Sequence, residues 1–237
     1  MKSPSLQNQT RRHFVNGGLA LVAANLALGL HGEGAEKAAV DAPRKASPNE
    51  ALMEEHGLLN RVLIIYEESI RRLTAGEEMP PGPLLEAAKI VRKYIEDFHE
   101  ILEQDFLFPR FINGNVMKDL VQVLVEQHLG GRHLTEDVLH IATTGALKTK
   151  EDREKCAGTL RKFVFMYHAH EAREDTVLFP TFRGLVSAHE YDALREEFEK
   201  RERFLFGGES FPVMEGKIVA IETELGIHEL ARFTQGL

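Results

Sequence analysis

Two stretches of the sequence, HEILEQDFLFP at residues 99–109 and HEAREDTVLFP at residues 170–180, share one form although their first residues lie 71 positions apart. Each begins with a His-Glu pair, carries a second Glu four residues after the His, and ends in Leu-Phe-Pro. On a helix, residues four apart lie one above the other on the same face. In each stretch the His and this second Glu can therefore aim at one point, which indicates a duplicated unit with half of a site in each copy.

The spacing of apolar residues around these stretches predicts four helices. The first has a clear start, because Ser47 can cap a helix that carries Pro48 and Glu50 in its first turn, and it should end at Gly76. The other three are expected over residues 84–109, 116–142 and 150–179. No stretch alternates as a strand would, and the connections are short. The predicted fold class is all-α: an antiparallel four-helix bundle built from two pseudo-symmetric helical hairpins, with an extra C-terminal helix and tail.

Three regions are predicted along the chain. Residues 1–45 form a signal peptide and linker, residues 46–185 form the bundle, and residues 186–237 form a C-terminal helix and tail that pack on it. The extra helix is expected over about residues 187–205, where the dense charges of REEFEKRER indicate a solvated face.

The first region has the features of a targeting segment. Thr10-Arg11-Arg12-His13-Phe14 precedes GGLALVAANLALGL at residues 17–30, a modestly apolar run that is short for a membrane span. This order resembles a twin-arginine export signal, which carries proteins already folded. The alternatives are a membrane anchor or a chance pair of arginines. We therefore expect a periplasmic protein without permanent membrane insertion.

Composition excludes several classes of function. The 237 residues carry a formal charge of −8 and no basic stripe, which disfavours nucleic acid as a partner. Cys156 is the only cysteine, so an intrachain disulfide and a cysteine-rich zinc or iron-sulfur site are both excluded.

The other two predicted helices contribute one histidine each to the inner faces. His56 precedes His99 by 43 residues, and His128 precedes His170 by 42, so each half offers a His and then a His-x-x-x-Glu. The candidate ligands are His56, His99, Glu103, His128, His170 and Glu174. Any one of these histidines alone is more typical of a hydrogen-bonded core residue. Together with two buried glutamates they would be costly in a core without a cation, which a metal supplies. Imidazole and carboxylate without thiolate suit iron, manganese or zinc, and two bridging glutamates suit a pair of metals.

With these residues the chain resembles the hemerythrin-like (HHE cation-binding) family, over about residues 48–182. The resemblance implies a centre of two non-haem Fe ions, in which each histidine pair binds one iron and the two glutamates bridge the irons beside an oxo or hydroxo group. The pairs would be His56 with His99 and His128 with His170.

The third helix departs from the pattern of the family's oxygen carriers, which have His-x-x-x-His there. His128 is followed four residues later by Arg132, and His133 would reach the site only through a π-bulge at Gly130-Gly131. Otherwise His133 is a surface residue or lies behind the ligands. A centre with four histidines is more similar to the iron-sulfur-repair and iron-sensing branches. The two glycines either open a path for a small molecule or permit close packing against another helix.

Several functions agree with such a centre. The leading hypothesis is an exported di-iron protein that binds O2, NO or peroxide. A second is a peroxide or NO reductase or an iron-sulfur-repair-like enzyme, with Tyr66 or Tyr167 as candidate electron donors and an unknown external donor; otherwise both tyrosines are core aromatics. A ferritin-like oxidase is suggested by Glu96-x-x-His99, but Tyr167 occupies the matching position of the second copy. The last is a structural or storage bundle holding zinc or iron.

Overall fold

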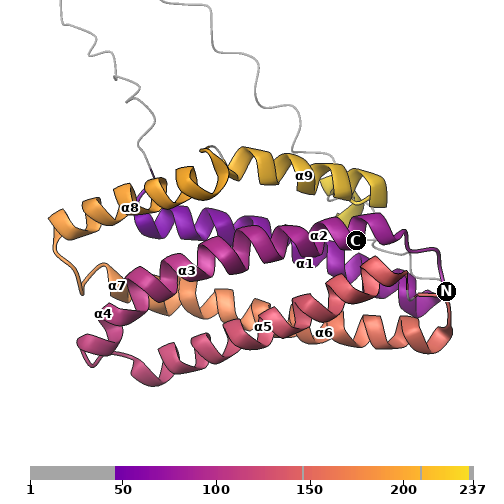
Figure 1. The fold of residues 1–237 in the computed structure, drawn as a ribbon, viewed down its shortest axis with the longest axis horizontal. Helices are drawn as coiled ribbons and strands as arrows, with labels where there is room; N and C mark the ends of the chain where they lie inside the picture. Colours follow the sequence, from indigo (N-terminus) through magenta and orange to yellow (C-terminus); the bar gives the residue numbers. More distant parts are fainter. Residues whose placement is uncertain (1–45, 146, 209, 235–237) are drawn as a thin grey trace, which may run out of the picture. The chain divides into compact units, whose positions relative to one another are not determined.

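The structure is a computed structural model that describes residues 46–145, 147–208 and 210–234. Within these ranges the chain consists of helices and short connections and contains no strand (Figure 1), which confirms the all-α prediction. None of the described helices is long and apolar enough to cross a membrane. The predicted export signal and linker of residues 1–45 lie outside the described residues.

The first predicted helix is α1, Pro48–Ala75. Its start is a capping box, in which the Ser47 hydroxyl accepts from the backbone N–H of Glu50 and the Glu50 carboxylate accepts from that of Ser47. Gly76 ends the helix in the left-handed conformation, with φ of 71°. Both boundaries agree with the sequence prediction.

The two repeated stretches lie in two long helical runs, and both runs change from α-helical to wider, π-helical turns at the repeated glutamate. The first run consists of α2 (Pro81–Ile90), η1 (Val91–His99), α3 (Glu100–Leu102), η2 (Glu103–Leu107) and α4 (Phe108–Asn113). The second consists of α6 (Lys150–Arg173), η3 (Glu174–Leu178) and α7 (Phe179–Phe182). The segments η1, η2 and η3 have π-helical turns, and η1 has no counterpart in the second run.

The repeated Leu-Phe-Pro ending explains the shared wide turn. The N–H of Phe108 donates to the carbonyl of Glu103, and the N–H of Phe179 donates to that of Glu174, so each bond spans five residues. The proline that follows has no N–H, and in an α-helix its ring would crowd the carbonyl four residues back. The chain therefore passes each proline in a wider turn, which begins at the repeated glutamate.

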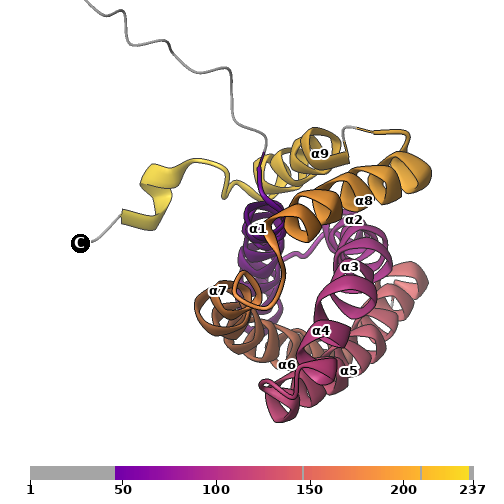
Figure 2. The same ribbon diagram turned by 90° about the vertical axis from the view of Figure 1, so that its left-hand side faces the viewer.

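The remaining helices are α5 (Lys118–Thr144), α8 (Ala188–Phe206), α9 (Ser210–Leu225) and the short η4 (Leu230–Thr234). The helix α1 contacts α6, α6 contacts α5, α5 contacts α2, and α2 and η1 contact α1 in turn. The helix α1, the helix α5 and the two helical runs that begin with α2 and α6 thus form four helical columns. Viewed along their length, these columns surround a common centre (Figure 2). The helices α8 and α9 lie outside this ring: α8 contacts α1 and η1, and α9 contacts α1 and α2.

Gly131 is a point of close packing between α5 and α6. A Cβ at this residue would lie 2.1 Å from Oη and 2.8 Å from Cζ of Tyr167. A Cβ at Gly130 would meet only Met166 Sδ, at 3.8 Å. Of the two roles considered for the glycine pair, the structure favours helix packing: the space beside Gly131 is filled by a tyrosine and is no path to the centre.

Gly131→Ala should therefore destabilise the protein by about 1–3 kcal/mol, because the buried tyrosine must move. The matched control, Gly130→Ala, should be neutral or stabilise it by up to about 1 kcal/mol, because alanine favours a helix and has room there. Urea unfolding of both variants measures the difference. Equal effects would contradict the packing role of Gly131.

Candidate metal centre

The six candidate ligands come together at the centre of the helices. They form two groups that share both glutamates: His56, His99, Glu103 and Glu174, and Glu103, His128, His170 and Glu174. Within each group, one nitrogen or oxygen atom per residue lies within 4.8 Å of the others. Every member is buried, with at most 3% of its surface exposed. Each group has the donor atoms and the spacing to hold a metal ion.

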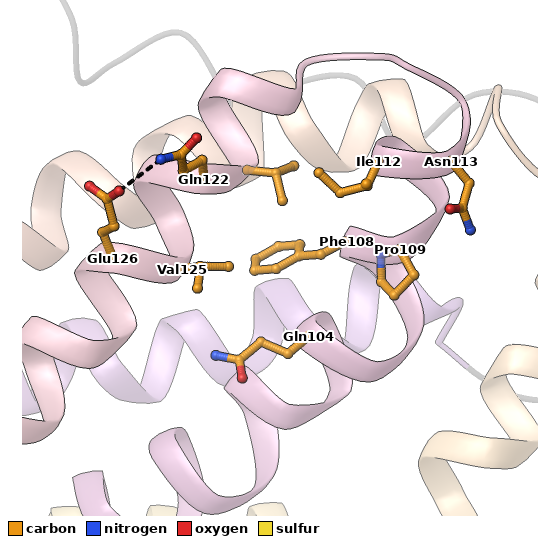
Figure 3. A pocket seen from close by; sticks show the side chains of 9 residues that line it. Gln104, Phe108, Pro109, Ile112, Asn113, Gln122, Val125 and Glu126 are labelled. Carbon is orange, nitrogen blue, oxygen red and sulfur yellow. Dashed lines mark hydrogen bonds between the residues drawn. The ribbon is translucent and has the colours of Figure 1, made fainter.

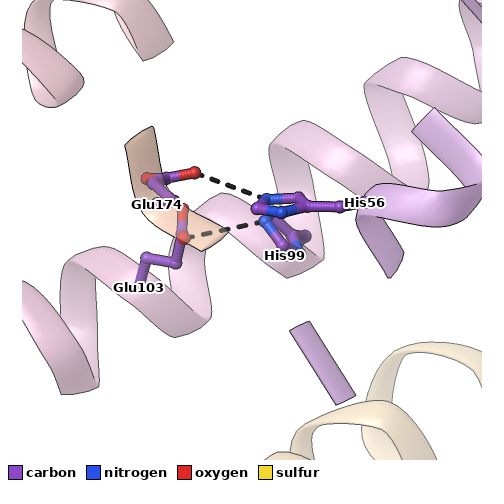
Figure 4. A group of neighbouring side chains, drawn as sticks. All are labelled: His56, His99, Glu103 and Glu174. Carbon is purple, nitrogen blue, oxygen red and sulfur yellow. Dashed lines mark ion pairs between the residues drawn. The ribbon is translucent and has the colours of Figure 1, made fainter. Parts of the chain in front are cut away.

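Each glutamate lies between two histidines from different pairs. Glu103 places Oε1 at 3.7 Å from His99 Nε2 and Oε2 at 3.4 Å from His128 Nε2. Glu174 places Oε2 at 3.3 Å from His56 Nε2 and at 3.1 Å from His170 Nε2. Figure 4 shows the first group, with both carboxylates directed at the two imidazoles. The wide turns that begin at these glutamates thus direct their side chains to the space between the histidine pairs.

The outer nitrogen of each histidine has its own polar partner. His56 Nδ1 lies 2.8 Å from Asp175 Oδ1, and His99 Nδ1 lies 2.7 Å from Glu55 Oε2. The side-chain amides of Gln104 and Gln127 lie 2.7 Å from His128 Nδ1 and 2.9 Å from His170 Nδ1. A partner oxygen that accepts from Nδ1–H fixes the ring orientation and leaves Nε2 free to bind a metal, as at His56, His99 and His170. At His128 the amide atom that lies at Nδ1 is Gln104 Nε2, and the amide must turn over to present its oxygen in the same way.

Sequence reasoning missed these four partners, although the repeat marks them. Glu55 and Gln127 directly precede a ligand histidine, and Gln104 and Asp175 directly follow a ligand glutamate. Each partner serves a histidine on a different helix, so its role became visible only with the packing of the helices.

The carboxylates of the two glutamates lack hydrogen-bond partners. Both carboxylate oxygens of Glu103 and of Glu174 are buried without a hydrogen-bond partner, although histidine nitrogens approach to ion-pair distance. Burial and the charge of Glu174 raise the pKa of Glu103. Burial also acts to raise the pKa of Glu174, but His170 and His56 lower it well below its usual range. Unpaired buried carboxylates are rare in native proteins, and a cation bound between them would supply the missing partner.

The histidines differ in protonation when no metal is bound. Burial, with the nearby His170, lowers the pKa of His128 to about 3, and burial with the nearby His56 lowers that of His99. Burial also acts against the charged form of His56, but hydrogen bonding to Asp175 and Glu174 raises its pKa to about 10. His99 and His128 are thus held in the neutral form that binds metal, whereas His56 must release a proton to do so.

Neither Arg132 nor His133 reaches the centre. The helix α5 continues without a wide turn through Gly130 and Gly131, so the π-bulge alternative is wrong, and His133 is exposed. Arg132 Nη2 lies 2.8 Å from Glu100 Oε2 and also donates to the carbonyl of Glu96. The centre therefore has four histidines.

The two tyrosines considered as electron donors, Tyr66 and Tyr167, are both buried. Tyr167 donates to Glu100 Oε1 at 2.9 Å, and its ring centroid lies 5.6 Å from that of His170. Tyr66 packs edge-on against Phe163 at 5.2 Å. Glu96, the residue that suggested a ferritin-like motif, belongs to neither ligand group and lies 2.8 Å from Arg92.

The metal-free protein should lose stability as pH rises from about 6.5 to about 8. Burial raises the pKa of Glu55, Glu100 and Glu171 to about 8. In this interval the folded state holds protons that the unfolded chain has lost, so the free energy of unfolding falls. The lowered pKa values of His99 and His128 act in the opposite direction only below about 6.5, where unfolded histidines are protonated.

Urea unfolding with a chelator at several pH values measures this slope, and Glu55→Gln should reduce it. A free energy of unfolding that is constant or rises over the interval would contradict the assignment. With metal bound the fall should be smaller, because ligation favours the deprotonated histidines.

Comparisons with other proteins give relatives but no activity. The sequence matches no family model, and no solved structure matches it. The uncharacterized proteins Mb2018 of Mycobacterium bovis and Rv1995 of Mycobacterium tuberculosis are each 42% identical to this chain over 185 residues. The matched segment covers 78% of this chain and 72% of each relative. At this identity and coverage, the chain belongs to the family of these mycobacterial proteins.

Proposed function

We propose that the protein is a hemerythrin-like di-iron protein that binds a small ligand, O2, NO or peroxide, and that its four central helical columns form an antiparallel four-helix bundle. The observation that carries the proposal is the pair of buried glutamates, Glu103 and Glu174. Each glutamate faces one histidine from each of the two pairs, and neither of its carboxylate oxygens has a hydrogen-bond partner. Two overlapping groups that share two carboxylates suit two metals better than one.

Iron is the metal that the proposed ligand binding requires, and the donor set is compatible with it. Each group offers two imidazoles and two carboxylates and no thiolate, a set that suits iron, manganese and zinc. Four such donors complete the tetrahedral coordination that zinc prefers in structural sites. Iron takes more ligands than this, so the same donors leave it a position for an outside ligand. A zinc-holding structural or storage bundle is the alternative that metal analysis tests.

In this proposal the chain supplies positioning and protection. The partners of Nδ1 hold each imidazole with Nε2 toward the centre, and the buried surroundings exclude water. A bound iron pair would supply the redox change that reversible ligand binding requires. With the predicted export signal, we expect this activity in the periplasm, and export after folding would let the protein acquire its metal in the cytoplasm.

Peroxide or NO reduction is the second candidate function. The observation that favours it is Tyr167, whose buried ring lies beside the ligand histidine His170 and whose hydroxyl donates to Glu100. Reduction also needs an external electron donor, so turnover with an added donor separates the enzyme from the binding protein.

Metal analysis and visible spectra of the full-length protein test the proposal. We expect two irons per chain after purification in air, with charge-transfer bands that disappear on anaerobic reduction and return or change on exposure to O2. One zinc per chain, or no metal, would contradict the di-iron assignment.

The matched control is the double variant Glu103→Gln, Glu174→Gln. It should lose both metals yet fold, because glutamine keeps the shape and removes two buried charges. Its metal-free form should be at least as stable in urea as metal-free wild type, whereas added Fe(II) should raise the melting temperature of the wild type alone. A strongly destabilised double variant would mean that the carboxylates serve the fold and not a metal.

A further inference from the structure

The two histidine pairs have partners of different charge. The pair His56 and His99 is held by the carboxylates of Asp175 and Glu55. The other pair is held by the amides of Gln104 and Gln127. The partners occupy equivalent positions in the repeat, so the two copies share the contact but differ in its charge.

This difference affects how strongly each pair binds a cation. A carboxylate that accepts from Nδ1–H makes the imidazole a stronger base and adds negative charge near the metal, whereas an amide is neutral. Changing such a partner typically alters metal affinity by roughly 10- to 100-fold. Charge therefore favours metal at the His56 and His99 position.

The His128 side also has a more open approach. A pocket of about 600 Å³ lies between α4 and α5, with mostly apolar walls that include Phe108, Ile112 and Val125 (Figure 3). Gln104 and Phe108 line this pocket and also contact His128: the amide lies at Nδ1, and the Phe108 ring stacks on the imidazole with centroids 5.7 Å apart. These two side chains therefore connect the pocket wall to the His128 ring.

The other side is covered. The helix α8 contacts α1 and η1, which carry His56 and His99. A recess of about 210 Å³ beside Glu55 is lined in part by Phe198 and Glu202 of α8. This recess is smaller than the pocket between α4 and α5, and α8 forms part of its wall.

We propose that the two metal positions are unequal: the position at His56 and His99 retains its metal, and the position at His128 and His170 releases and regains its metal through the pocket between α4 and α5. The proposal rests on the proposed function, since it requires a centre of two metals. It assigns Asp175, Glu55, Gln104 and Gln127 as positioning residues that set the order of metal release.

Release of Fe(II) to a chromogenic chelator under anaerobic conditions tests the order. The reduced full-length protein should release two irons in two phases of equal size, with rates that differ by roughly 10-fold or more. Glu55→Gln with Asp175→Asn should accelerate the slow phase by roughly 10- to 100-fold, and Gln104→Glu with Gln127→Glu should slow the fast phase. These isosteric changes also leave the fold testable by circular dichroism.

The route is tested by filling the pocket. Val125→Trp should slow the fast phase and leave the slow phase unchanged. Val123→Trp is the control, because Val123 lies on the same helix, is exposed, and does not line the pocket.

The outcomes separate the two proposals. A protein with fewer than two irons would contradict the proposed function. Release of both irons in one phase would overturn the inequality of the positions. So would a change of the fast phase in the Glu55→Gln, Asp175→Asn variant, or of the slow phase in the Gln104→Glu, Gln127→Glu variant. Equal rates in the two tryptophan variants would overturn the route.

Discussion

Two carboxylates buried among four imidazoles are the constraint on which the rest of this structure depends. Glu103 and Glu174 are fully buried, and no hydrogen bond offsets the loss of hydration of their oxygens. Such a group costs several kcal/mol in a core unless a cation or a proton accompanies it. In the metal-free protein the proton on His56 and the raised pKa of Glu103 reduce this cost. A metal would remove the need for both, so folding and metal binding favour the same arrangement.

The backbone accommodates this arrangement through its prolines. Each repeated proline forces a wide turn that starts at the site glutamate, and the phenylalanine before each proline stacks on a ligand histidine. Phe108 lies on His128 and Phe179 lies on His56, with interplanar angles of 19° and 18°. The Leu-Phe-Pro ending therefore shapes the turn, directs the carboxylate and covers an imidazole, which gives a physical reason for its presence in both copies.

The helices and the six candidate ligands could be predicted from the sequence because both depend on local periodicity. Residues four apart share a helix face whatever the helix packs against, so His99 with Glu103 and His170 with Glu174 needed no tertiary information. The partners of Nδ1 could not be found in this way, since Glu55 serves a histidine 44 residues away on another helix. The role of Gly131 likewise depends on which side chain of α6 faces it. The helix α9 was expected only as a tail, because its apolar residues are spread around the helix instead of forming one stripe.

Burial alone does not distinguish the ligand glutamates from the other buried acids of the described chain. Glu68 is bound by Arg71 and Arg72, and Glu222 by Arg61. Glu100 accepts from Tyr167 and pairs with Arg132. Arg132 occupies the position at which the oxygen carriers of the hemerythrin-like family, which this chain resembles, have a fifth histidine. An arginine at that position supplies no donor to a metal and instead neutralises an acid one helix away. The carboxylates left for a cation are those without an arginine or a hydrogen-bond donor, and at the centre of the helices these are Glu103 and Glu174.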